Sequence, residues 1–126
     1  MLQKIEALFS IVAGIGICGI WIMLMSAGGI AELETEPVRI TLHVLSEFLT
    51  ALLLIIGGVA LLKKKSRAKA FFYVSQGMLI YSVLNAAGYY VQLNNAAMGI
   101  MFSVILAISA VLLIMEFAKS YAEKTE

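Results

Sequence analysis

Residues 52–69 read LLLIIGGVALLKKKSRAK, an uncharged apolar run that ends in a strongly basic segment. Upstream, the apolar character extends back to about Val38, and Pro37 stands just before it, where a missing backbone N–H does not weaken a helix. A transmembrane helix needs about 20 mostly apolar residues, because the hydrocarbon core of a bilayer is about 30 Å thick. The sequence therefore predicts a membrane-spanning helix over about residues 38–62.

The composition of the whole chain supports the same class. Hydrophobic residues make up 62% of the 126 residues and charged residues 13%, with a mean hydropathy of +0.98. A soluble domain has about 45–50% apolar and about 25% charged residues. We predict one all-α domain over residues 1–126, a four-helix transmembrane bundle of antiparallel, up-down helices. Its other three spans are expected at about residues 7–30, 68–93 and 96–118.

The basic residues predict how these helices are oriented. Five of the nine Lys and Arg residues lie between positions 63 and 69. With four spans, Lys4, Lys119 and Lys124 fall on the same side as this segment, and only Arg39 falls on the other. Short basic loops stay cytoplasmic. We therefore expect both termini and residues 63–69 in the cytoplasm, in a multi-pass protein of the plasma membrane.

The basic segment has two interpretations. It either contacts the head groups of anionic lipids or only determines topology, and the positive-inside bias alone explains the second. The residues concerned are Lys63, Lys64, Lys65, Arg67 and Lys69.

The second and third predicted spans each carry polar side chains along one arc of the helix. Helical periodicity places each set within about 100° of its helix circumference. Counted from the outer ends, Glu47 and Asn85 lie at the same depth of about 12 Å, and His43 and Tyr89 at about 6 Å. We expect the two arcs to face each other as a polar pocket near the outer surface. The candidate site residues are Arg39, His43, Glu47 and Thr50 on the second span, and Tyr81, Asn85, Tyr89 and Gln92 on the third.

Ionisable side chains inside a membrane span typically mark a function. The first hypothesis is a site that binds a small ligand or moves a proton or ion. The second is a non-catalytic accessory or scaffold subunit, in which the polar residues hold helices together. A third is quinone-linked redox chemistry at His43, Glu47 and Tyr89. No nucleophile motif supports an enzyme.

The glycines of the apolar runs indicate close helix packing. Gly14, Gly16 and Gly19 match G-x-G-x-x-G, but a dinucleotide site requires a preceding strand, and this motif lies within a continuous apolar run. Small residues let neighbouring helices approach closely in a membrane. The same interpretation applies to Gly57-Gly58 and to the series Gly99, Ser103 and Ala107.

No cofactor fingerprint is present, and we expect no cofactor. Cys18 is the one cysteine, so it can form neither an intramolecular disulfide nor a cysteine-based zinc site. Thioethers suit soft Cu(I), although methionine is also a common apolar filler; the methionines concerned are Met23, Met25, Met98 and Met101, with His43 expected nearby.

Trp21 either lines the polar cluster or simply packs. A net charge of +1 suggests no nucleic-acid partner. The expected surroundings are lipid, within a homo-oligomer or a larger membrane complex.

In size and span number the chain resembles the small four-helix multidrug exporters and the DoxX-like membrane proteins. The exporters use a membrane-embedded glutamate in their first span, and the predicted first span, residues 7–30, contains no glutamate. The likeness to DoxX proteins is in size and helix number. Neither resemblance assigns a role to a residue of this chain.

The predicted topology is testable by cysteine labelling. Thr35→Cys and Ser66→Cys, each in a Cys18→Ala background, place one thiol in the outer and one in the basic connection. In intact cells an impermeant maleimide should modify position 35 and leave position 66 unmodified until the membrane is permeabilised. The reverse labelling pattern would overturn the orientation.

Overall fold

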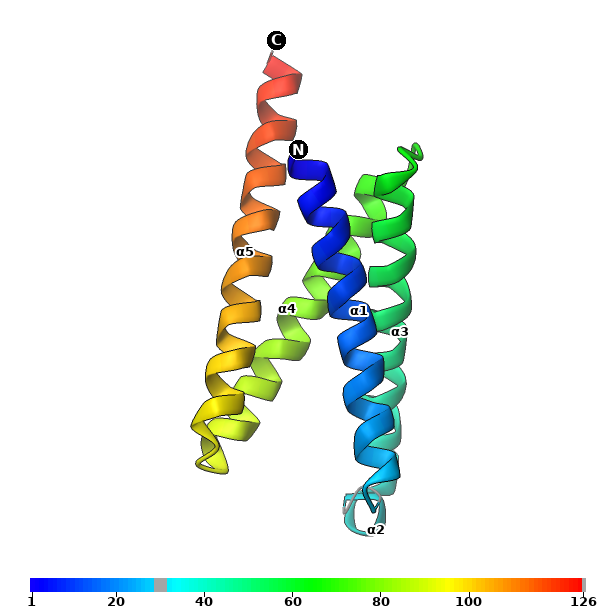
Figure 1. Cartoon of the computed structure of the whole chain (residues 1–126), viewed down its shortest axis with the longest axis vertical. Helices are drawn as coiled ribbons and strands as arrows, with labels where there is room; N and C mark the ends of the chain where they lie inside the picture. The colour runs from blue at the N-terminus through cyan, green and yellow to red at the C-terminus, as the bar shows by residue number, and fades with distance from the viewer. Residues whose placement is uncertain (29–31, 126) are drawn as a thin grey trace. The chain divides into compact units, whose positions relative to one another are not determined.

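A computed structural model describes residues 1–28 and 32–125 of the chain, and this part is helical without strands (Figure 1). Four of its helices are long and apolar enough to cross a membrane, which confirms the predicted all-α class. The helices are α1 (Leu2–Ser26), α2 (Glu32–Thr35), α3 (Pro37–Leu62), α4 (Ala68–Gln92) and α5 (Ala96–Thr125).

Several helix ends lie close to the predicted ends of the spans. α3 begins at Pro37 and ends at Leu62, next to the basic segment, and α4 ends one residue before the predicted position 93. α1 begins at Leu2, five residues earlier than predicted, and the predicted end of this span at Ile30 lies outside the described residues. α5 continues to Thr125, beyond the predicted 118, because its polar tail contains good helix formers such as Lys, Ala and Glu.

The chain divides into two compact units, Met1–Ser75 and Gln76–Glu126, with the boundary inside α4. The first unit contains α1, α2, α3 and the first two turns of α4. The second contains the rest of α4 and α5. Each unit is described by itself below.

In the first unit, α1 and α3 run antiparallel with their backbones in close contact. A Cβ atom built on Gly14 would lie 2.8 Å from the carbonyl oxygen of Ala51, and one built on Gly58 would lie 2.8 Å from the carbonyl oxygen of Ala7. Real Cβ atoms essentially never approach another atom so closely. Each helix therefore presents an alanine and a glycine, two turns apart, to the glycine and alanine of the other. Ala7 and Ala51 have no exposed surface.

Only part of the glycine interpretation is confirmed. Gly14 and Gly58 lie at the α1–α3 contact, and a Cβ atom on Gly57 would lie 3.3 Å from Cβ of Phe71 at the start of α4. Gly16 and Gly19 have no neighbour within 4 Å of a built Cβ among the described residues. The G-x-G-x-x-G motif is therefore a coincidence of spacing in which only Gly14 is a close helix contact.

The two long helices that precede a tight turn, α3 and α4, end in the same way. Lys64 has φ 54° and Asn94 has φ 59°, the left-handed conformation typical of the residue after a helix. The N–H of Lys65 donates to the carbonyl of Ala60 at 3.0 Å, and the N–H of Asn95 donates to that of Tyr90 at 2.9 Å. These Schellman-type bonds satisfy carbonyls that the helix end would otherwise leave unpaired.

The second unit is an antiparallel hairpin of the later part of α4 and α5. The rings of Tyr90 and Phe102 stack with centroids 5.6 Å apart and an interplanar angle of 11°. Deeper in the hairpin, the Ser109 hydroxyl donates to Oε1 of Gln76 at 2.5 Å, and both residues are buried. This side-chain bond between two apolar helices supplies a partner for polar groups that lipid cannot solvate.

The α1–α3 contact predicts opposite effects for two alanine substitutions in the same helix. Gly14→Ala adds a methyl group against the backbone of Ala51 and should destabilise the fold by about 1–3 kcal/mol through overpacking. Gly16→Ala adds the same methyl group where no neighbour lies nearby, so stability should stay constant or rise because alanine favours helix. Unfolding in mixed SDS–detergent micelles measures both. Equal losses of stability in the two variants would contradict this contact.

Candidate functional site

The polar arc predicted on the second span lies on α3, in the first unit. Arg39, His43, Glu47 and Thr50 follow one another at helical spacing, so they share one side of the helix. Arg39 and His43 are exposed, Glu47 is half-buried and Thr50 is buried. The arc therefore runs from the exposed start of α3 into its packed middle.

Arg39 at the start of α3 pairs with an acidic residue of the preceding turn. Its guanidinium donates through Nε to Oε2 of Glu36 at 2.6 Å, and through Nη2 to the same oxygen. Both side chains are largely exposed, and exposed pairs contribute little to stability. The cation thus points toward the α2–α3 connection.

His43 contacts an aromatic residue of the neighbouring helix. The ring centroids of Trp21 on α1 and His43 on α3 lie 5.7 Å apart, with an interplanar angle of 72°. The sequence left open whether Trp21 lines the polar cluster or simply packs, and the structure brings it to His43. An edge-to-face contact of this kind between two aromatic rings helps to hold the imidazole in place.

The hydroxyl groups on the arc bind to their own helix. Ser46 Oγ donates to the carbonyl of Leu42 at 2.8 Å, and Thr50 Oγ1 donates to the carbonyl of Ser46 at 2.8 Å. Such i−4 bonds are the usual way for Ser and Thr to satisfy their hydrogen-bonding capacity in an apolar helix. Thr50 therefore serves the helix. Arg39 pairs with Glu36, and the ionisable residues farther along the arc are His43 and Glu47.

The polar residues predicted on the third span lie on α4, in the second unit. Tyr81 is 72% exposed, and the Asn85 amide donates to the carbonyl of Tyr81 at 2.8 Å. The Tyr89 ring meets that of Tyr90 edge to face at 5.2 Å, and Gln92 is exposed. The two halves of the predicted site thus belong to different units, and their pairing across the units stays a prediction.

Sequence reasoning missed several buried polar residues. Glu6 is only 1% exposed, and Ser10 on the same side of α1 is also buried. The apolar run of the first span begins at Ala7 and so excludes Glu6, whereas α1 begins at Leu2. On α5, Glu116 is buried and accepts a hydrogen bond from the Ser120 hydroxyl at 3.3 Å. A carboxylate inside an apolar run was the available signal for Glu116.

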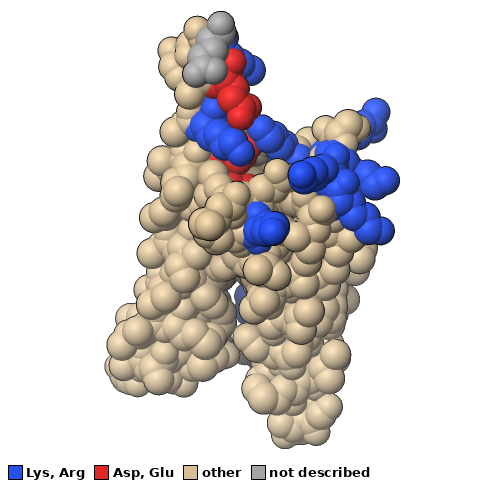
Figure 2. All heavy atoms as spheres, turned by 45° about the horizontal axis from the view of Figure 1, so that its top comes forward, with Lys and Arg blue, Asp and Glu red and all other residues tan. Residues whose placement is uncertain are grey.

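The basic segment comprises the turn between α3 and α4 and the first two residues of α4. All five of its Lys and Arg side chains are exposed, and Figure 2 shows the gathering of basic side chains at this end of the helices. The residues are Lys63, Lys64, Lys65, Arg67 and Lys69.

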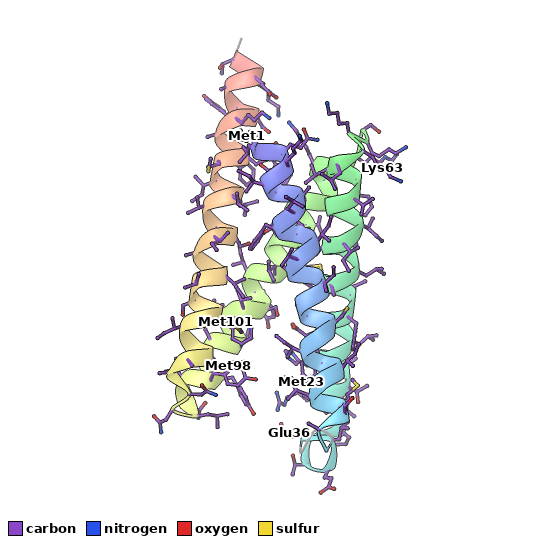
Figure 3. All side chains as sticks on the ribbon, viewed as in Figure 1. Met1, Met23, Glu36, Lys63, Met98 and Met101 are labelled. Carbon is purple, nitrogen blue, oxygen red and sulfur yellow. The ribbon has the colours of Figure 1, made fainter. Side chains whose placement is uncertain are left out.

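The four methionines considered as ligands for a soft metal are divided between the two units. Met23 lies on α1 near the Glu36 end of the first unit, and Met25 belongs to the same helix, whereas Met98 and Met101 lie on α5 (Figure 3). Among the described residues, no three His, Cys, Asp or Glu side chains lie close enough together to hold a metal ion.

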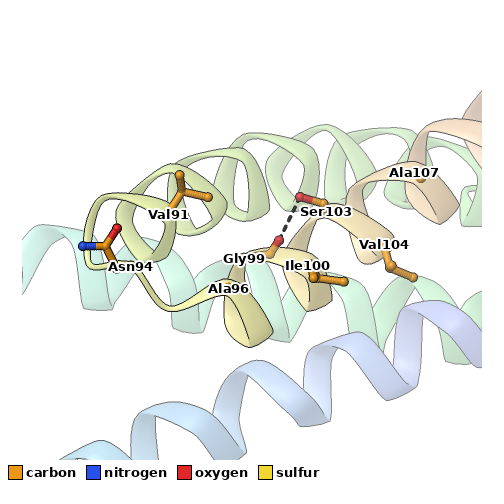
Figure 4. Close-up of a pocket in the computed structure, with 8 residues that line it drawn as sticks. All are labelled: Val91, Asn94, Ala96, Gly99, Ile100, Ser103, Val104 and Ala107. Carbon is orange, nitrogen blue, oxygen red and sulfur yellow. Dashed lines mark hydrogen bonds between the residues drawn. The ribbon is translucent and has the colours of Figure 1, made fainter.

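A groove of about 560 Å³ lies in the second unit, where α4 turns into α5 (Figure 4). Gly99 is buried against Val91, but Ser103 and Ala107 are exposed, so the predicted packing face is only partly covered. The Ser103 hydroxyl donates to the carbonyl of Gly99 at 2.8 Å. None of the predicted site residues lines this groove; the lining residues are Val91, Asn94, Ala96, Gly99, Ile100, Ser103, Val104 and Ala107.

Comparison with known proteins places the chain in a family that has no assigned function. No curated protein and no solved structure matches the sequence. One family model, described as "Domain of unknown function (DUF8058)", matches residues 1–126, which is the entire sequence. The protein therefore belongs to the DUF8058 family.

Proposed function

We propose that this protein binds a small ligand, or transfers a proton, at the polar arc of α3, with His43 and Glu47 as the reacting groups. The observation that carries the proposal is the contact between His43 and Trp21, one helical turn from Glu47, in a helix apolar enough to cross a membrane. The imidazole of His43, the carboxyl group of Glu47 and the indole of Trp21 are thereby brought together in one region of the first unit.

The position of Glu47 along α3 explains why its presence calls for a function. Ten residues separate it from Pro37, which corresponds to about 15 Å along the helix axis. A charged side chain near the centre of a spanning helix costs about 2.5–3.5 kcal/mol on insertion scales. A carboxyl group is retained at such a depth where it binds a cation, holds a proton or pairs with another polar group.

The chemistry available to the pair is proton exchange and hydrogen bonding. Imidazole can bind and release a proton near neutral pH, and it can donate or accept a hydrogen bond through either nitrogen. A rise of about 6 Å separates residues four positions apart, a distance that one water molecule or a ligand atom can bridge. A proton accepted by His43 at the outer side could then pass to Glu47.

The proposal includes the side of the membrane from which this site is reached. If the basic turn faces the cytoplasm, the start of α3 faces outward, and His43 is reached from outside the cell. The membrane concerned would be the plasma membrane. Transport of a proton or ion requires a second, inward exit, whereas ligand binding does not.

A specific observation favours a second candidate, an accessory subunit of a membrane complex. Tyr81, Asn85, Tyr89 and Gln92 leave exposed polar side chains on α4. Polar side chains of a spanning helix typically face protein rather than lipid. A second copy of this chain or a different subunit would supply such a surface, and the residues would then serve assembly.

The proton-binding form of the proposal predicts a pH-dependent fluorescence signal. Trp21 is the one tryptophan of the chain and contacts His43. Protonation of the His43 imidazole should quench the Trp21 emission, so the emission should change when it is followed from about pH 8 to about pH 5. His43→Gln should remove the transition without unfolding the protein, and Glu47→Gln should alter it by removing the neighbouring carboxylate.

Glu34→Gln is the matched control for the charge change, because Glu34 lies in α2 before the spanning part of α3. It should leave the transition as in the wild type. A wild-type emission that is flat over this pH range, or a transition that persists in His43→Gln, would contradict proton binding at this site. Retained α-helical circular dichroism in each variant excludes unfolding as the cause.

A further inference from the structure

The start of α1 lies beside the end of α3, next to the basic turn. The Gln3 side-chain amide donates from Nε2 to the carbonyl oxygen of Leu61 at 2.7 Å. Lys4 follows Gln3 directly and is exposed, and Lys63 lies two residues after Leu61. Figure 3 shows Met1 and Lys63 at the same end of the first unit. This hydrogen bond holds the start of α1 beside the turn. It therefore brings Lys4, as a sixth basic residue, to the end of the unit where the turn lies.

The shape of the turn is fixed by its own backbone. The N–H groups of Lys64 and Lys65 donate to the carbonyls of Leu61 and Ala60 at 3.2 and 3.0 Å. Lys64 takes the left-handed conformation that this type of helix end requires. Residues 63–69 contain no Asp or Glu, so all the charged residues of this segment are basic. The exposed residues Lys63, Lys64, Lys65 and Arg67 thus belong to a turn with a defined backbone.

We propose that the start of α1 and the α3–α4 turn form a single binding surface for the phosphate head groups of anionic membrane lipids. This inner-end surface consists of Lys4, Lys63, Lys64, Lys65, Arg67 and Lys69. It does not depend on the activity proposed for His43 and Glu47.

The position of the charges selects lipid as the partner. Lys63 directly follows the apolar run that ends at Leu62, and Lys69 lies in the first turn of α4, two residues before Phe71 and four before Tyr73. Aromatic residues and lysines at the end of a spanning helix lie at head-group depth. Clusters of four to eight Lys or Arg residues directly cytoplasmic to a membrane helix bind anionic lipids. The inner-end surface fits this description in charge and in depth.

The test compares lipid binding by the full chain in detergent micelles, measured by native mass spectrometry. Phosphatidylglycerol and phosphatidylcholine with identical acyl chains are the two probes. The wild type should retain phosphatidylglycerol preferentially, and Lys63→Gln/Lys65→Gln should weaken its binding about thirtyfold, because each basic residue near the surface strengthens binding about fivefold. Lys4→Gln should weaken it about fivefold.

Lys119→Gln/Lys124→Gln is the matched control, since it removes two positive charges from the end of α5, where Glu123 lies between them in sequence. Its affinity should stay within about twofold of the wild type. An equal loss in this control, or equal retention of phosphatidylcholine, would overturn the proposal. So would displacement by millimolar inorganic phosphate, because the surface would then bind a free anion. An unchanged affinity in Lys4→Gln would show that the turn binds lipid without α1 and would contradict the composite surface.

Discussion

The contact on which the first unit depends is the backbone approach between α1 and α3. In lipid, apolar side chains gain little by leaving their solvent, so helices associate through close packing and through polar bonds. Alanine and glycine bring the two backbones together at Ala7 with Gly58 and at Gly14 with Ala51. Any larger side chain at either glycine would meet a carbonyl oxygen, which cannot rotate away. Two contacts separated by two turns fix both the distance between the helices and their register.

That register carries over to both ends of the helix pair. Toward the start of α1, the residue that meets Leu61 is Gln3, and toward its end the residue that meets His43 is Trp21. Each of these contacts continues the same antiparallel alignment beyond the central glycines. The candidate proton or ligand site and the proposed lipid-binding surface thus lie at opposite ends of this helix pair. Both depend on the glycine seam, in which Ala7 meets Gly58 and Gly14 meets Ala51.

Much of this fold could be predicted from sequence, because the signals are local. An apolar run bounded by Pro37 and by a basic segment defines α3 to within one residue, and Asn94 and Asn95 mark the turn before α5. The partner of each helix face could not be predicted in the same way. Gly14, Gly16 and Gly19 look equivalent in the sequence, and only the register decides that Gly14 faces α3. For the same reason the sequence does not decide whether Trp21 packs or lines the polar cluster, although its contact with His43 is the most specific feature of the site. Glu6 was missed because an apolar run locates a membrane span, whereas hydrogen bonding determines where the helix begins.

The central claim is that the glycine seam positions Trp21 against His43. The most direct measurement is the pH dependence of Trp21 fluorescence in Gly14→Leu, compared with Gly16→Leu as the variant of equal size on the same helix. We expect Gly14→Leu to keep its helical circular dichroism and lose the transition that depends on His43, because the leucine separates α1 from α3. Gly16→Leu should keep the transition. A wild-type transition in Gly14→Leu, or its loss in both variants, would contradict the claim that this seam sets the site.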